Sequence, residues 1–160
     1  MKRTFSFLVM LAIVSISVLA QNKQAAHKPV SKPVAGASAA SIANGKRMYL
    51  KYCLSCHQAD GGGVQNMNPP LSGSSYALGD KARIIKIVLN GFNQGVEVGG
   101  QTYTNAMPSF NYLKDKDVAD VLTYVRSHFT NKASAVKTIE VTSIRSAGTT
   151  IGSTGTRTSH

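Results

Sequence analysis

The pentapeptide Cys53-Leu54-Ser55-Cys56-His57 constrains this 160-residue chain more than any other feature. It contains both cysteines of the chain, with a histidine directly after the second one. Two thiols at this spacing can each add to one vinyl group of a porphyrin, and the adjacent imidazole then reaches the iron from the same side of the ring. The motif therefore predicts one covalently attached haem c per chain, held by Cys53, Cys56 and His57.

Other uses of a C-x-x-C pair fit the sequence less well. A thioredoxin-like redox couple needs a βαβ context, and no strand pattern precedes Cys53. A zinc site needs further ligands, whereas His27 lies in a linker and His128 lies near a helix end. With two cysteines in all, the chain cannot form a four-cysteine metal site or a disulfide-rich scaffold.

The N-terminus has the pattern of an export signal. Lys2 and Arg3 precede the uncharged apolar residues 5–20, and the polar Gln21 follows. This stretch is slightly shorter than the ~20 residues that span a bilayer. We therefore expect a cleaved signal peptide over residues 1–20 and a periplasmic protein, which would be membrane-anchored if the signal is not cleaved.

Composition divides the rest of the chain into three parts. Residues 21–40 contain two prolines, no acidic residue and no Phe, Trp or Tyr, which predicts a flexible linker. Residues 41–131 contain both cysteines and every Phe and Tyr outside the signal, which predicts the haem domain. Residues 132–160 form a basic, Ser/Thr-rich extension that we expect to be mostly disordered, although residues 138–147 can form one short helix.

Apolar periodicity predicts three main helices in the haem domain. The first covers residues 41–53 and ends at the cysteines. The second begins after Asp80, a good N-cap, and stops at Gly91. The third covers residues 115–129, with its apolar stripe at Val118, Val121, Leu122, Val125 and Phe129. Residues 96–103 read as a short β-hairpin that turns at a Gly-Gly pair, so the fold class is all-α with one small hairpin.

Residues 41–131 resemble a class I, mitochondrial-type monohaem cytochrome c. Gly45 and Tyr49 stand eight and four residues before Cys53, where the family has a glycine and an aromatic residue in its N-terminal helix. Val121 and Tyr124 correspond to the family's C-terminal helix. The resemblance implies the cytochrome c fold, in which these two helices cross and the glycine allows their backbones to approach.

The same resemblance extends to the pairs Pro69-Pro70 and Met107-Pro108 and to Leu71. It implies that the Pro69 carbonyl accepts the Nδ1–H of His57, that Leu71 packs on the haem, and that Met107 is the second iron ligand. Met67 is the alternative ligand, but its loop belongs on the His57 side of the haem. Weaker candidates for hydrogen bonds to a haem propionate or to the methionine region are Tyr76, Arg83, Tyr103 and Asn105.

The hairpin, the Met-Pro pair and residues 117–126 resemble bacterial cytochrome c domains that accompany periplasmic dehydrogenases, nitrite reductases and terminal oxidases. This resemblance implies a one-electron carrier between such redox proteins, either as a monomer or as a subunit of a larger oxidoreductase. No acid–base pair or nucleophile cluster stands out, so we do not expect an enzyme. If Met107 does not bind the iron, the alternative is an open-site haem enzyme or gas sensor.

The formal net charge of +11 first suggests a nucleic acid or an anionic surface as partner. Residues 1–40 carry +5 of this charge and residues 132–160 carry +3, so most of the excess lies outside the haem domain. We therefore expect no nucleic-acid binding. The basic ends favour acidic protein partners or an anionic membrane surface.

Overall fold

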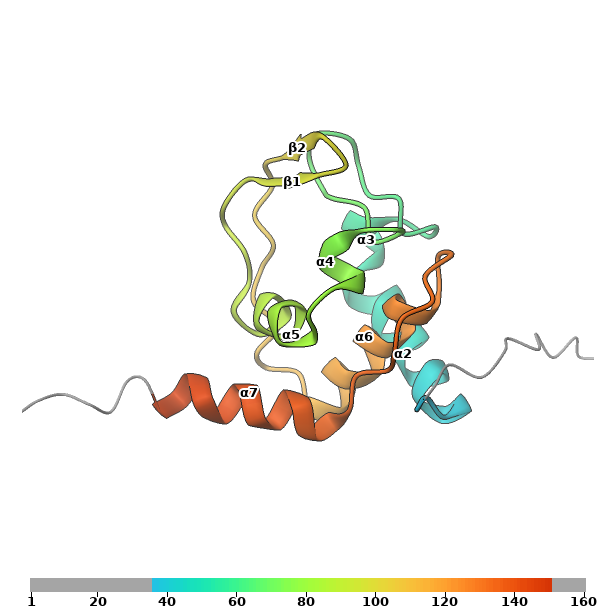
Figure 1. Cartoon of the computed structure of the whole chain (residues 1–160), viewed down its shortest axis with the longest axis vertical. Coiled ribbons are helices and arrows are strands. Elements are labelled where there is room, and N and C mark those ends of the chain that lie inside the picture. The colour runs from blue at the N-terminus through green and yellow to red at the C-terminus, as the bar shows by residue number, and fades with distance from the viewer. Residues whose placement is uncertain (1–35, 151–160) are drawn as a thin grey trace, which may run out of the picture. The chain divides into compact units, whose positions relative to one another are not determined.

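The computed structural model of the protein describes residues 36–150 (Figure 1). The predicted signal peptide and most of the predicted linker lie outside the described residues. The elements in chain order are α2 (Ala39–Tyr52), α3 (Leu54–His57), α4 (Ser75–Leu78), α5 (Lys81–Asn90), β1 (Val96–Val98), β2 (Gln101–Tyr103), α6 (Asp115–Ser127) and α7 (Thr138–Thr150). Among the described helices, none has the length and apolar character needed to cross a membrane.

The helices α2 and α6 cross in close contact (Figure 1). Gly45 lies at the crossing, where a Cβ would overlap the carbonyl oxygen of Asp120 and lie 2.8 Å from the Cβ of Tyr124. Beside it, the buried ring of Tyr49 packs at a tilt against the rings of Tyr124 and Phe129, with ring centroids 5.6 and 5.1 Å away. The crossing implied by the family resemblance is therefore present, and the absence of a side chain at Gly45 permits it.

A buried carboxylate reinforces the same crossing. Asp120 of α6 accepts hydrogen bonds from Ser41 Oγ at 2.6 Å and from Asn44 Nδ2 at 2.7 Å, both on α2. It also forms an ion pair with Lys116, one turn earlier on its own helix. A charge buried without partners would be costly, so these partners make the burial of Asp120 tolerable and fix the first turns of α2 against α6.

The helix boundaries follow local capping signals. Ser38 caps α2 by accepting from the Ser41 backbone N–H at 3.0 Å, and Asp80 caps α5 by accepting from that of Ala82 at 2.9 Å. The third predicted helix is shorter than expected: α6 ends at Ser127, because His128 is extended (φ −117°, ψ −178°). Phe129 and Thr130 then turn the chain with positive φ angles of 54° and 69°. That turn lets Phe129 fold back onto Tyr49.

The predicted hairpin is confirmed. Strands β1 and β2 pair antiparallel, with Val96 opposite Tyr103, and Gly99 and Gly100 turn the chain at φ angles of +60° and +77°. In Figure 1 the hairpin lies at the far end of the domain from α7. A small antiparallel pair on a helical frame is the all-α architecture predicted from the sequence.

The C-terminal extension differs from the expectation of a mostly disordered segment. Residues 132–137 are held against α6, where the buried Thr123 hydroxyl donates to the Val136 carbonyl at 3.1 Å and accepts from its N–H at 2.9 Å. The chain then forms α7, whose fully buried Val141 belongs to the main apolar core. The helix lies along α5 and α6 (Figure 1). Its order comes from these tertiary contacts rather than from its own composition.

The crossing predicts a contrast between two helical glycines. Gly45→Ala should lower the free energy of unfolding by about 1–3 kcal/mol, because the new methyl group forces α2 and α6 apart. Gly148→Ala in α7 is the matched control, because nothing lies within 4 Å of its Cβ position. The control should be neutral or stabilise by up to about 1 kcal/mol through helix propensity. Denaturant unfolding of the purified variants measures both values, and equal stabilities would contradict the close approach.

Candidate functional site

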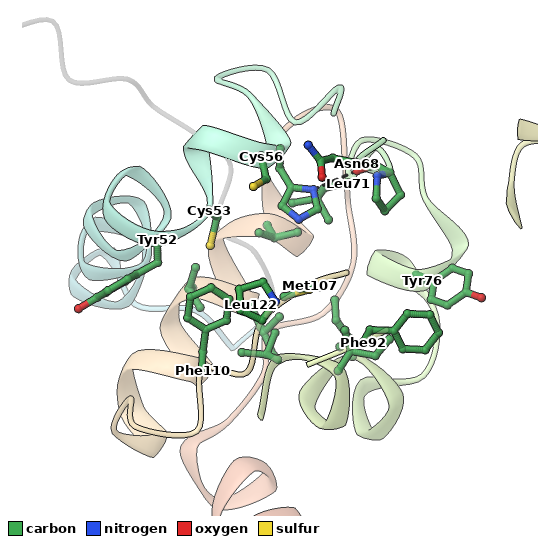
Figure 2. Close-up of a pocket in the computed structure, with 18 of the residues that line it drawn as sticks. Tyr52, Cys53, Cys56, Asn68, Leu71, Tyr76, Phe92, Met107, Phe110 and Leu122 are labelled. Atoms are coloured by element: carbon green, nitrogen blue, oxygen red, sulfur yellow. Dashed lines mark hydrogen bonds between the residues drawn. The ribbon is translucent and has the colours of Figure 1, made fainter. Parts of the chain in front are cut away.

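Separate stretches of the chain enclose one cavity of about 360 Å³ (Figure 2). This volume lies within the range of about 300–1,000 Å³ that is usual for small-molecule sites. The walls come from the helices α2 to α6, from β1 and from the loops that contain Pro69 and Met107. Most of the lining side chains are apolar or aromatic, among them Met48, Tyr52, Leu71, Ile84, Val88, Phe92, Met107, Phe110, Leu113, Val121, Leu122 and Val125. The cavity therefore suits a large, flat, mostly apolar ligand.

All six residues predicted to hold the cofactor line this cavity: Cys53, Cys56, His57, Pro69, Leu71 and Met107. The C-x-x-C-H motif reaches the cavity because Cys53 ends α2 and the rest of the motif forms the single turn of α3. Figure 2 shows both thiols beside the cavity, with Met107 lying deeper in it. Met67, the alternative ligand, is 48% exposed and does not line the cavity.

The two cysteines are free thiols in different surroundings. Cys56 is exposed and Cys53 is half-buried. Burial, with the neighbouring Cys56 as a smaller cause, raises the pKa of the Cys53 thiol to about 12. A thioredoxin-like couple requires a thiol whose pKa is lowered, so Cys53 does not fit that chemistry. Its thiol lies at the cavity edge, where a thioether to a bound porphyrin can form.

His57 is held in one orientation by the loop that follows it. The side chain is 8% exposed, and Nδ1 donates to the Pro69 carbonyl oxygen at 3.0 Å. Since a carbonyl can only accept, the proton sits on Nδ1 and Nε2 carries the free lone pair. Burial lowers the pKa of His57, with a smaller opposing effect from this hydrogen bond. The neutral imidazole with a free Nε2 is the form that binds iron.

The segment that contains Met107 is held by the end of α5. The Met107 N–H donates to the Phe92 carbonyl at 2.7 Å, and the Phe92 N–H donates to the Met107 carbonyl at 2.9 Å. Gly91 makes this pairing possible: its φ is +76°, and a Cβ there would lie 2.7 Å from the Met107 carbonyl oxygen. Sequence reasoning missed this support, because no motif links Phe92 to a residue 15 positions later.

Hydrogen bonds also join the loop that contains Pro69 to the segment that contains Met107. The Asn105 N–H donates to the Met67 carbonyl at 3.0 Å, and Asn105 Nδ2 donates to Asn68 Oδ1 at 3.2 Å. Asn68 directly precedes Pro69, and Asn105 lies two residues before Met107. These bonds therefore connect the loop that orients His57 to the segment that presents Met107.

The other residues considered for hydrogen bonds to a haem propionate or to the methionine region, Tyr76, Arg83 and Tyr103, lie in different places. Tyr76 lines the cavity beside Phe92, on the side away from Cys53 (Figure 2). The Arg83 guanidinium lies 3.6 Å from the centre of the Tyr76 ring in a cation–π contact, but Arg83 itself does not line the cavity. Tyr103 is buried in the hairpin and does not line the cavity. The structure thus brings Tyr76, Arg83 and Asn105 towards the site but not Tyr103.

These features fit a covalently bound haem. Apolar walls match the macrocycle, two thiols stand at the edge, and the cavity lining includes one neutral imidazole and one thioether. Sequence reasoning did not identify the wall residues Tyr52 and Phe92 as part of the site. The periodicity of residues 115–129 did predict Val121, Leu122 and Val125 as an apolar stripe, and these three line the cavity.

Comparison with known proteins supports the same assignment. Residues 42–129 match the family model described as Cytochrome c. Cytochrome c-552 of Thermus thermophilus is 34% identical over 94 residues, which cover 56% of this chain and 63% of that protein. The cytochrome c subunit of a quinone alcohol dehydrogenase from Gluconacetobacter polyoxogenes is 31% identical over 116 residues, 69% of this chain. The cytochrome c subunit of gluconate 2-dehydrogenase from Pantoea cypripedii is 33% identical over 106 residues, 63% of this chain.

The chain spans less than two thirds of cytochrome c-552 and only 24% of each of the two dehydrogenase subunits. The likeness is therefore to part of those subunits. The family match covers more than half of the chain and includes the C-x-x-C-H motif, both crossing helices and the Met-Pro pair. The chain belongs to the cytochrome c family, whose members carry covalently attached haem c.

Proposed function

We propose that this protein is a one-electron carrier whose haem is attached through Cys53 and Cys56 and ligated by His57 and Met107. The observation that supports it best is that these four side chains line one apolar cavity. When bound, the haem supplies a reversible Fe(III)/Fe(II) couple. The protein's residues bind and orient the group, exclude water from it and set its potential.

Each residue has a distinct part in this proposal. His57 offers Nε2 to the iron, and Pro69 keeps the proton on the opposite nitrogen. Met107 offers a neutral sulfur, which favours the ferrous state and raises the potential relative to two imidazoles. The partly buried position of Met107 supports it over the exposed Met67. An unchanged pair of ligands in both redox states keeps the reorganisation on electron transfer small.

A second candidate is an electron-transfer subunit of a larger oxidoreductase. The names of two of the relatives support it, because both are cytochrome c subunits of dehydrogenases. In either case the partners are redox proteins, such as a dehydrogenase, a reductase or a terminal oxidase. The proposal includes export to the periplasm, with residues 1–20 as signal, 21–40 as linker, 41–131 as haem domain and 132–160 as C-terminal extension.

Voltammetry of the purified holoprotein tests the carrier role. We expect one reversible one-electron wave that oxygen or small substrates do not turn into a catalytic current. A sustained catalytic current would contradict it and favour the open-site enzyme. Intact mass spectrometry of the same sample gives the mature N-terminus, which decides whether residues 1–20 have been removed.

The ligand assignment predicts different effects at two methionines. Met107→Ala should abolish the weak sulfur-to-iron band near the red end of the oxidised spectrum and lower the reduction potential. It should also tighten carbon monoxide binding to the reduced protein by about tenfold or more, because the distal position is then open in every molecule. Met67→Ala is the matched control and should leave all three properties unchanged. If the band disappears in the Met67 variant instead, the assignment is wrong.

Attachment through two thioethers predicts that covalent haem is lost only when both cysteines are replaced. Under denaturing conditions, mass spectrometry should find haem bound to the wild type and, through one remaining thioether, to Cys53→Ala and Cys56→Ala. The double variant should lose all covalent haem. Ser55→Ala, which changes a side chain between the two thiols, should keep it. Haem retained by the double variant would contradict attachment at these positions.

A further inference from the structure

Arg145 of α7 joins the C-terminal extension to the segment that leads from Met107 into α6. Its Nε donates to Asp115 Oδ1 at 2.6 Å, its Nη1 to the Asn111 carbonyl at 2.6 Å and its Nη2 to the Leu113 carbonyl at 2.9 Å. One guanidinium therefore binds three successive acceptors within five residues. Arginine suits such a site because its planar fork presents several donors in fixed directions. Residue 145 lies beyond the family match, which ends at residue 129.

The segment that Arg145 binds belongs to the cavity wall. Phe110 and Leu113 both line the cavity, and Leu113 is 9% exposed. The Phe110 N–H donates to the Val88 carbonyl at 2.9 Å, so α5 holds the middle of the segment. Past Leu113, α6 begins at Asp115, and its N-cap residue Lys114 makes no side-chain hydrogen bond to the helix. Arg145 holds the residues that lead into this helix start by donating to their carbonyls and to Asp115.

The helix that carries Arg145 is anchored by other contacts as well. Lys81 Nζ lies 3.1 Å from Glu140 Oε1 in an ion pair between α5 and α7. Val136 exchanges two hydrogen bonds with Thr123 of α6, and Val141 is fully buried. Removal of the Arg145 side chain should therefore leave α7 in place. Because α7 is anchored by these other contacts, loss of the guanidinium should release residues 111–115 without displacing α7.

We propose that Arg145 is a positioning residue for Met107: it holds residues 107–115 in place and so strengthens the iron–sulfur bond. This inference rests on the proposed function, because it requires Met107 to be the second ligand. The segment is fixed on one side by Phe92 and α5 and on the other by α7, through Arg145 and through the Thr142 hydroxyl, which donates to Asp115 Oδ2 at 2.6 Å. Thr142 holds only Asp115, so loss of Arg145 releases the Asn111 and Leu113 carbonyls and raises the fraction of molecules in which Met107 has left the iron.

Binding of imidazole to the oxidised holoprotein measures that fraction. An external ligand can bind only where Met107 has dissociated, so the apparent dissociation constant falls as the open fraction rises. Loss of the charged hydrogen bonds in Arg145→Ala should lower the apparent constant roughly tenfold. The sulfur-to-iron band should weaken, and the reduction potential should fall.

Lys81→Ala is the matched control, because it also removes a basic residue that holds α7, and the Lys81 ammonium donates to Glu140 rather than to the segment that Arg145 binds. It should lower stability in denaturant unfolding, yet leave imidazole affinity, band and potential at wild-type values. Arg145→Lys keeps the positive charge beside Asp115 but cannot reach all three acceptors. We expect the apparent dissociation constant of Arg145→Lys for imidazole to lie between those of Arg145→Ala and the wild type. This variant serves as the test if the alanine variant does not fold.

The outcomes separate this inference from the proposed function. Equal imidazole affinity in Arg145→Ala, Lys81→Ala and wild type, with the band intact, would overturn the positioning role and leave Met107 ligation standing. Wild-type protein that lacks the band and binds imidazole as tightly as Met107→Ala would overturn the ligation itself. A tighter affinity confined to the Arg145 variants supports both.

Discussion

The backbone contact between α2 and α6 at Gly45 determines where the haem motif lies. Because α2 runs directly into Cys53, the angle and depth at which it crosses α6 set the position of both thiols and of His57. The same helix α6 supplies part of the cavity wall, through Val121 and Val125 among others. A side chain at Gly45 would move the motif away from that wall. The crossing thus couples the covalent attachment site to the surface against which the macrocycle packs.

The polar groups around the crossing make this contact specific. A buried carboxylate loses its hydrogen-bond partners when one helix slides along the other, and such a loss is costly. Asp120 accepts from Ser41 and Asn44 only in the observed register. Arg126, 3% exposed on the same helix, donates to the carbonyls of Ala77 and Ser134. These bonds tie α6 to α2, to the α4 region and to the extension at once.

Local sequence patterns predicted most of this arrangement. The periodicity of residues 115–129 and the signals at Asp80 and Gly91 each act within one element, and they predicted α6 and α5. The close crossing at Gly45 was instead an expectation from the family resemblance. A short helix over residues 138–147 was expected, but the order of residues 132–137 and the packing of the helix could not be predicted, because both depend on partners elsewhere. Thr123 reads as an ordinary helix residue, yet its buried hydroxyl makes both hydrogen bonds to Val136. Likewise, nothing near Arg145 in the sequence indicates that its acceptors lie at residues 111–115.

The two predicted iron ligands therefore differ in how they are held. His57 is fixed by the loop immediately after it, through Pro69, only 12 residues away. Met107 is fixed by Phe92 across a backbone pairing and, through residues 111–115, by Arg145 on the last helix. Under the positioning role proposed for Arg145, a change in the extension would reach Met107 through residues 111–115, whereas the hydrogen bond that orients His57 comes from Pro69. The α2–α6 crossing places the attachment motif, and Met107, if it is the second ligand, depends in addition on residues at the end of the chain.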